Sequence, residues 1–430
     1  MVKTFVGIGS RVSIDTASVT RYCSIGNTLG EEWANSEYST EALAEIKCRN
    51  AGTASELHAQ VLTNGRASAN TVTLRKNNAD TALTLSITAA TTGLFSDTGE
   101  SVSIADGDDY CIKVVNNDST GTFTFKDIAM VYEPSSGSAV QMGCCTDFSY
   151  SASSLQLTFY LSFPGVYFGN QFTESNIQSE CFVATTFSDL QVYIAVNDRS
   201  NNSSMVFRDN GADGNQSVTI TGSTTGKFED TSNSDVLSVG DKYNLKLVRA
   251  SGSSGQSVEV SSFSMLLTTN GTGFPILANG FGASLSTGTE YSPVFYYSDN
   301  FSTESDAEYY VPFGVDTEDL SGFVQSNSST TTTTVQFRVD GSNVNQSFSV
   351  SAASTGRFTD ASNTDTINSG SSCTVSIGGM DAAYFMRDLG IFATPVAAAG
   401  YANNVNGVSN AAIGEVIDVL KANVSNVMGA

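Results

Sequence analysis

Residues 70–97 read NTVTLRKNNADTALTLSITAATTGLFSD, and the same pattern returns at residues 203–230 and 333–360. In each copy, alternating polar and apolar residues flank a pair that suits a tight turn: Asn77-Asn78, Asn210-Gly211 and Asp340-Gly341. An alternation with a period of two is typical of a strand with one buried face, and these pairs tolerate the positive φ of a hairpin turn. The sequence therefore predicts the same β-hairpin three times.

The alternation also predicts which side chains of each hairpin point into a core. The inward positions are Val72, Leu74, Leu85 and Ile87, then Met205, Phe207, Val218 and Ile220, then Val335, Phe337, Phe348 and Val350. Further along, the motif Thr-Thr-Gly-x-Phe-x-Asp and its third variant predict a turn at the glycine and a core anchor at Phe95, Phe228 and Phe358.

An arginine marks the same point in each copy, at Arg75, Arg208 and Arg338, with spacings of 133 and 130 residues. The copies align around it without a gap. Residues identical in all three include Glu41/Glu174/Glu304, Leu57/Leu190/Leu320, Asn64/Asn197/Asn327 and Asp97/Asp230/Asp360. The chain therefore contains three copies of one domain, and each residue can be compared with its equivalents in the other two copies.

Each copy holds roughly eight strands in about 130 residues, the size of a jelly-roll sandwich. We predict an all-β chain of three tandem jelly-roll-like β-sandwich domains and a short C-terminal helical docking segment. The predicted units are residues 1–135, 136–268, 269–395 and 396–430. In the last unit, apolar residues from Ile413 to Val427 fall on one helical face and predict an amphipathic helix over about 411–427. We expect it either to pack on the third domain or to dock to a neighbouring subunit or the virion.

A Gly-Asp step opens an alternating run at Gly107-Asp108 and at Gly240-Asp241, whereas the third copy has Gly370-Ser371. This step in an eight-stranded domain resembles the trimer-forming jelly rolls of the complement C1q and tumour necrosis factor type. The ordered set of motifs resembles repeats in structural proteins of tailed bacteriophages, such as fibres and decorations. Short repeats like Val405-Asn406-Gly407-Val408 also end many phage virion proteins. The resemblance covers nearly all of residues 20–395 and implies a homotrimer.

Composition excludes some partners. Lys and Arg total 20 against 43 for Asp and Glu, a net charge of −23. Because phosphate backbones are bound through Lys and Arg, we expect neither nucleic acid nor an anionic membrane as a partner. The start, Met1 to Gly7, has no signal-peptide pattern, and no run of about 18 apolar residues occurs, which predicts synthesis in the host cytoplasm.

The seven cysteines contain no CxxC pair. Cys48 matches Cys181 and Val311, which predicts a buried thiol used as a small apolar side chain. The adjacent Cys144-Cys145 fits packing better than metal or redox use, although both stay open.

Residues for catalysis are scarce. His58 is the only histidine; its counterparts are Gln191 and Ser321, and it points away from Leu57, which predicts a solvated side chain. The stretch Asp209 to Asn215 resembles a calcium loop but lacks the closing glutamate and coincides with the hairpin turn. We therefore predict no catalytic, cofactor-binding or metal-binding residues.

The triplicated carboxylates and arginine allow a repeated catalytic site, but a structural role is favoured. An arginine beside a carboxylate satisfies buried polar groups, and an aspartate after a turn accepts backbone N–H groups. The aromatic clusters are Tyr160, Phe163, Tyr167 and Phe168, and Phe295, Tyr296 and Tyr297. They fit a core or a subunit interface better than stacking on sugars.

These features favour a non-enzymatic structural protein of a tailed-bacteriophage virion, attached to capsid or tail subunits as a homo-oligomer. The alternative is a carbohydrate-binding adhesin or phage receptor-binding protein that recognises host surface glycans. An enzyme acting on surface glycans is a third hypothesis, which would need two close carboxylates in a cleft.

Overall fold

The chain is almost entirely built of antiparallel strands. The computed structural model describes residues 3–13, 19–25, 39–118, 121–137, 139–150, 158–161, 163, 173–181, 183–250, 256–269, 273–279, 283–285, 288–293 and 301–396. The expected C-terminal helix over about 411–427 lies outside these residues. In the described part, no helix is long and apolar enough to span a membrane.

The first sandwich consists of two sheets with the strand orders β1-β9-β4-β7 and β2-β8-β5-β6. Strand β3 also pairs with β8, beside β2, and forms part of the sheet edge. The elements are β1 (Thr4–Ser13), β2 (Val19–Cys23), α1 (Glu41–Ala44), β3 (Ile46–Lys47), β4 (Gly52–Asn64), β5 (Asn70–Lys76), β6 (Ala79–Ile87), β7 (Gly93–Ile104), β8 (Asp109–Asn116) and β9 (Phe123–Pro134).

The second sandwich repeats this topology, with the orders β10-β18-β13-β16 and β11-β17-β14-β15 and with β12 beside β17. Its elements are β10 (Ala139–Tyr150), β11 (Thr158–Leu161), η1 (Glu174–Asn176), β12 (Ser179–Glu180), β13 (Thr185–Asn197), β14 (Ser203–Asp209), β15 (Ala212–Ile220), β16 (Gly226–Leu237), β17 (Lys242–Val248) and β18 (Val258–Thr269).

The third sandwich has the orders β19-β28-β23-β26 and β21-β27-β24-β25, with β20 beside β28 and β22 beside β27. Its elements are β19 (Phe274–Asn279), β20 (Ala283–Leu285), β21 (Gly288–Pro293), α2 (Glu304–Ala307), β22 (Tyr309–Tyr310), β23 (Val315–Asn327), β24 (Thr333–Val339), β25 (Ser342–Val350), β26 (Gly356–Ile367), β27 (Ser372–Met380) and β28 (Tyr384–Pro395). The fold is therefore all-β and of jelly-roll type, as the sequence predicts.

The three predicted hairpins are β5–β6, β14–β15 and β24–β25. Their turn pairs all have positive φ, from 48° at Asp340 to 79° at Gly211. Gly93, Gly226 and Gly356 also have positive φ, between 104° and 113°, where a side chain would be strained. Both turn predictions are confirmed.

All twelve predicted inward positions of the hairpins are buried. The first domain has its own apolar cluster, whereas the buried apolar side chains of the second and third domains form one cluster that also includes Ala129 of the first. Phe95, Phe228 and Phe358 are an exception, because they are only partly buried and pack against the edge of these clusters. The prediction of a core anchor at these phenylalanines was wrong: they flank the core.

One repeated backbone feature was not predicted. Glu56, Asp189 and Asp319 have φ between 52° and 59°, each at a β-bulge in the long central strand β4, β13 or β23. Non-glycine residues rarely adopt this conformation. All three are acidic, so the repeated acidic residue before the shared leucine was the available sequence signal.

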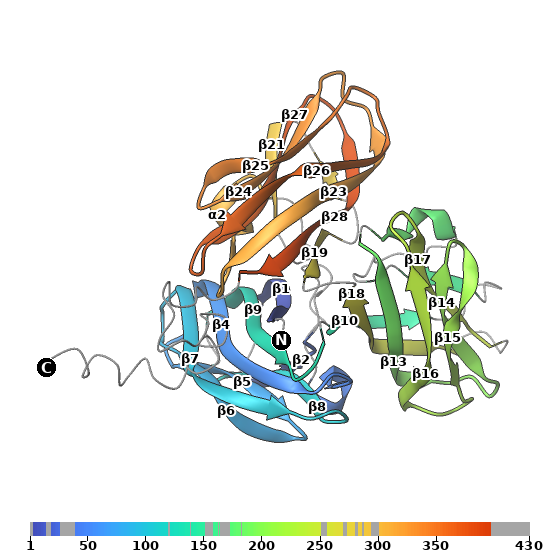
Figure 1. Ribbon diagram of the computed structural model, residues 1–430. Coiled ribbons are helices and arrows are strands. Elements are labelled where there is room, and N and C mark those ends of the chain that lie inside the picture. Colours follow the sequence, from blue (N-terminus) through green and yellow to red (C-terminus); the bar gives the residue numbers. More distant parts are fainter. Residues whose placement is uncertain are drawn as a thin grey trace, which may run out of the picture.

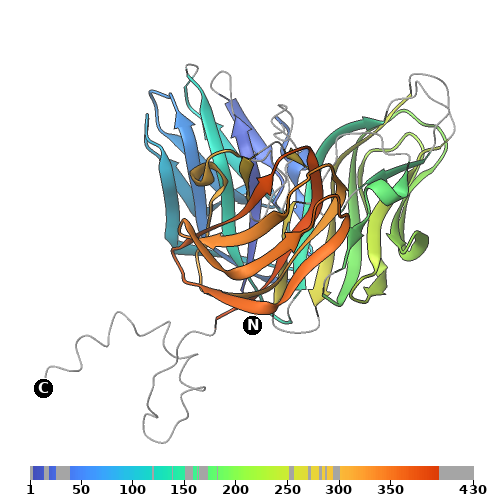
Figure 2. The ribbon, with the colours of Figure 1, turned by 90° about the horizontal axis from the view of Figure 1, so that it is seen from above.

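The three sandwiches lie against one another around a common centre (Figure 1). The first strand of each domain, β1, β10 or β19, lies toward this centre, and β1 contacts β10. In a view from above, the first and second domains lie at the left and right, and the third lies in front of them (Figure 2). Each domain contacts both of the others.

Candidate functional site

The shared arginine binds the shared glutamate in every domain. The glutamate is the first residue of the helical turn before the edge strand, and the arginine lies near the end of the first hairpin strand. In the first domain, Arg75 Nε and Nη2 donate to the two carboxylate oxygens of Glu41 at 2.7 Å each. The pairs Arg208–Glu174 and Arg338–Glu304 have the same two-pronged geometry.

These pairs are mostly buried and structural. Hydrogen bonding to Glu41 and Glu174 raises the pKa of Arg75 and Arg208, so both remain cationic. The arginines also donate to hairpin-turn carbonyls, as Arg75 does to Asn78. Each arginine therefore ties the helical turn to the hairpin, and no nucleophile or proton carrier is left free by the arrangement.

A second ion pair extends this group in two domains only. Asp80 bridges Arg75 and Lys113 in the first domain. In the second, Asp213 bridges Arg208 and Lys246, whereas the third domain has the uncharged pair Asn343 and Ser376 at these positions. The two charges are present or absent together, as expected of a structural pair.

The shared aspartate at the end of the Thr-Gly turn accepts backbone N–H groups, as predicted. Asp360 accepts from the backbone nitrogens of Ser347, Ser362 and Asn363 at 2.8–3.2 Å. Asp230 makes the equivalent bonds in the second domain. Burial favours the neutral form of Asp360, but hydrogen bonds from the Asn363 side chain and from these backbone groups outweigh it and lower its pKa to about 2.

We expect Asp360→Asn to lower the free energy of unfolding by about 2 kcal/mol, because an amide donor would then face backbone N–H groups. The carboxylate stabilises the fold above its unfolded pKa, and this contribution is lost as pH falls from 3.8 toward 2. Urea unfolding at pH 7 and pH 3 measures both effects. Glu318→Gln is the control, because Glu318 lies exposed on the paired strand β23. An equal loss in both variants would contradict the assignment.

A buried pair of Asp and Gln is likewise either present or replaced as a whole in each domain. Asp235 accepts from the backbone of Asn215 and Gln216, and the Gln216 amide bonds to the backbone of Phe187. Asp365 and Gln346 repeat this arrangement. The first domain has Val102 and Leu83 at these positions, so the polar pair is replaced as a unit by an apolar one.

The Gly-Asp aspartate fastens the hairpin turn. Asn77 donates to Asp108 at 2.7 Å and accepts from the backbone of Asp109 at 2.9 Å. Asn210 and Asp241 make the same contacts. In the third domain the turn itself carries Asp340, so a second aspartate at position 371 would repel it, and Ser371 stands there instead.

The described cysteines behave as apolar side chains. Cys23, Cys48, Cys111, Cys181 and Cys373 are buried, and Val311 is buried at the position of Cys48 and Cys181. Burial raises the pKa of Cys181 to about 11, which keeps the thiol protonated. The side chains of Cys144 and Cys145 lie outside the described part.

The aromatic clusters are partly visible. Phe159 and Phe163 are buried, whereas the Arg208 and Arg338 guanidinium groups lie over the Tyr160 and Tyr291 rings at 6.0 Å. These contacts stabilise the domains rather than leave a flat ring for a sugar. The remaining members of the two clusters, Tyr167, Phe168, Phe295, Tyr296 and Tyr297, lie outside the described residues.

Several residues that differ between the copies lie where the domains meet. Between the first and second domains, the Gln191 amide bonds to both the backbone N–H and the carbonyl of Lys47 on edge strand β3, at 3.2 and 2.8 Å. Gln141 bonds to the Lys47 carbonyl and the Arg49 N–H at 2.7 and 3.0 Å. The two glutamines thereby occupy an edge that otherwise lacks a partner.

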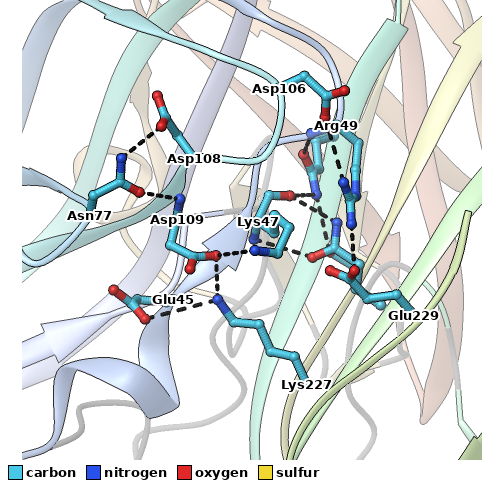
Figure 3. A network of polar contacts seen from close by, with 12 residues as sticks. Glu45, Lys47, Arg49, Asn77, Asp106, Asp108, Asp109, Lys227 and Glu229 are labelled. Atoms are coloured by element: carbon cyan, nitrogen blue, oxygen red, sulfur yellow. Dashed lines mark hydrogen bonds and ion pairs between the residues drawn. The ribbon is translucent and has the colours of Figure 1, made fainter.

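Ion pairs surround this edge (Figure 3). Arg49 pairs with Glu229, and Lys227 pairs with Asp109 and lies 3.9 Å from Glu45. Most of these side chains are less than one third exposed, so solvent screens them only in part. Beside them, Glu45, Gln191, Tyr193, Lys227 and Ser262 line a small pocket.

An ion pair joins the second and third domains, whose buried apolar side chains also form one cluster. Arg357 Nε lies 2.9 Å from Glu180, and its Nη1 donates to the Ser321 hydroxyl at 2.7 Å. Glu180 lies on edge strand β12, the counterpart of β3. Equivalent edge strands of the first and second domains therefore contact the next domain.

The third and first domains meet at an aromatic contact. The His58 ring packs edge-on against Tyr309 and Tyr310 of edge strand β22, with centroids 6.1 and 5.3 Å apart. Lys126 donates to the Ser305 carbonyl at 2.6 Å. His58 is only 1% exposed, so the prediction of a solvated histidine was wrong: it points away from its own core but into a neighbouring domain.

No catalytic or metal arrangement emerges in the part of the chain that is described. There, no three His, Cys, Asp or Glu residues gather as metal ligands. Residues Asp209 to Asn215 form the tip of hairpin β14–β15, with Asp213 bound to Arg208 and Lys246. The predicted absence of catalytic, cofactor and metal residues stays a prediction.

Comparison with known proteins adds little. No protein-family model and no curated protein matches the chain. Similar solved structures include one reported as "The Triple Jelly Roll Fold and Turret Assembly in an Archaeal Virus", at 14% identity over 90% of both chains with a TM-score of 0.17. PNGF-II matches at 8% identity over 82% of this chain and 100% of its own, with a TM-score of 0.19.

A Paenibacillus xanthan lyase matches at 9% identity over 92% of this chain and 51% of its own, with a TM-score of 0.16. At such scores, none of the three structures supports an argument about function. The strand order and the contacts between domains define the class: a protein of three tandem jelly rolls joined by contacts specific to each pair.

Proposed function

We propose that this chain is a non-enzymatic structural protein of a virus particle, of the kind that decorates or projects from the capsid or tail of a tailed bacteriophage. One observation carries the proposal. The polar groups common to the copies bind one another within each domain, and the groups that differ join one domain to the next. Both sets of groups therefore stabilise the structure.

The resemblance of the repeats to phage fibre and decoration proteins supports a location on a phage particle. Several similar domains on one rigid body favour attachment through many weak contacts, because linked sites bind with a high effective concentration. The partners would be capsid or tail subunits, with host surface glycans as a further partner if the protein serves attachment. The charge of −23 favours neither nucleic acid nor an anionic membrane.

Purified particles test the proposal. We expect mass spectrometry to find the chain at a fixed copy number per particle, and cryo-electron microscopy to place a three-lobed density on the capsid or tail. Absence from particles, with the protein instead secreted by the host cell, would overturn it. Binding of the purified chain to a glycan array, without particle association, would favour the adhesin alternative.

A further inference from the structure

The three contacts between domains use equivalent positions of the repeat. Lys47, Glu180 and Tyr310 occupy one position, at the edge strand after the helical turn. Gln191, Ser321 and His58 occupy another, on the long central strand. The same two surfaces of the repeat therefore meet at every step from one domain to the next.

Other contacts follow the same rule. Helix α1 of the first domain contacts β18 of the second, and Ser305 in α2 of the third binds Lys126 on β9 of the first. Strands β18 and β9 are equivalent. Lys227 and Arg357 likewise share one position and bind acidic residues of the preceding domain.

Contacts of this head-to-tail kind either close into a ring or continue as an open array. Here the third domain returns to the first through His58, Tyr309 and Tyr310, so the ring closes after three steps (Figure 1). Every edge strand that offers the contact, and every surface that receives it, is used within the chain.

The chemistry differs at each step. The first contact contains an ion-pair network with two glutamines, the second contains the Arg357–Glu180 pair, and the third is aromatic around His58. Placing Glu180 against His58 would bring Leu94, not an arginine, to the position of Arg357. An unpaired charge would then be buried, which disfavours any other order of domains.

We infer that this chain is a trimer of jelly rolls folded from one polypeptide, with the order of its domains fixed by three mutually incompatible contacts. The chain has no unused copy of this contact, so it does not trimerise through these surfaces. The homotrimer implied by the sequence resemblance is realised inside each chain. A partner meets three similar but distinguishable domains around one axis.

Charge reversal at the second contact tests the inference in the full chain. We expect Glu180→Arg to place two cations together, lower the thermal midpoint by about 5 °C and increase the radius of gyration in X-ray scattering. Glu180→Arg with Arg357→Glu should restore both values. Glu100→Arg, at an exposed position of β7, makes the same change in net charge and should leave both unaltered.

Three results would overturn the inference. The wild-type chain would scatter as an extended row of domains, the double reversal would be no better than the single one, or native mass spectrometry would find three chains that Glu180→Arg dissociates. A compact monomer rescued by the double reversal supports it. Far-ultraviolet circular dichroism of each variant shows that the domains remain folded, which separates ring opening from unfolding.

Discussion

Replacing Arg208 by methionine is expected to lower the free energy of unfolding by about 3 kcal/mol. The substitution keeps most of the apolar stem but leaves the Glu174 carboxylate without its two-pronged partner. It also frees the Gly211 carbonyl at the tip of the hairpin. Equilibrium unfolding in urea at pH 7 measures the loss.

A second substitution separates this effect from the loss of a less buried cation. Lys246→Met removes a cation that binds only the exposed Asp213, so it should cost less than about 1 kcal/mol. If Lys246→Met cost as much as Arg208→Met, the special role of the glutamate pair would be refuted.

Local chemistry explains why the hairpins were predictable. Turn pairs that tolerate positive φ and a strict alternation lie within about 20 residues of each other, so no distant contact is needed to specify them. Comparison of the copies added the Arg–Glu pair, because three identical arginines and glutamates indicate one shared contact. The helical turns that carry Glu41 and Glu304 were missed because four residues are too short to show a period.

The contacts between domains were not predictable in the same way. They join positions whose residue types change in every copy, such as Lys47, Glu180 and Tyr310, so neither identity nor alternation indicates them. Alternation predicted that His58 points away from Leu57 and from the core of its own domain, and within that domain this is correct. Only the packing of a second domain buries it. The available signal was the variation itself: positions that are free to differ in a repeat become specific when each copy has a different neighbour.

The stability of the first domain is expected to respond to pH through two buried groups with opposite effects: His58, at the contact that closes the ring, and Asp127 on β9. Burial lowers the pKa of His58 to about 4 and raises the pKa of Asp127, beside Lys126 on β9, to about 7. The neutral His58 stabilises the fold above pH 6.5, and this contribution is lost as pH falls toward 4. The protonated Asp127 stabilises the fold below pH 3.8, and this contribution is lost as pH rises toward 7.

Single substitutions should separate the two groups. His58→Gln introduces the residue found at the equivalent position, Gln191. As pH falls from 6.5 to 4, the free energy of unfolding of this variant should rise by about 3 kcal/mol relative to that of wild type, with their difference at pH 8 as the reference. Asp127→Asn should instead become more stable relative to wild type as pH rises from 4 to 7. Urea unfolding across this range measures both differences. Because the two effects oppose each other, the wild-type curve alone is uninformative. Parallel curves for all three proteins would show that neither group is held neutral in the folded protein.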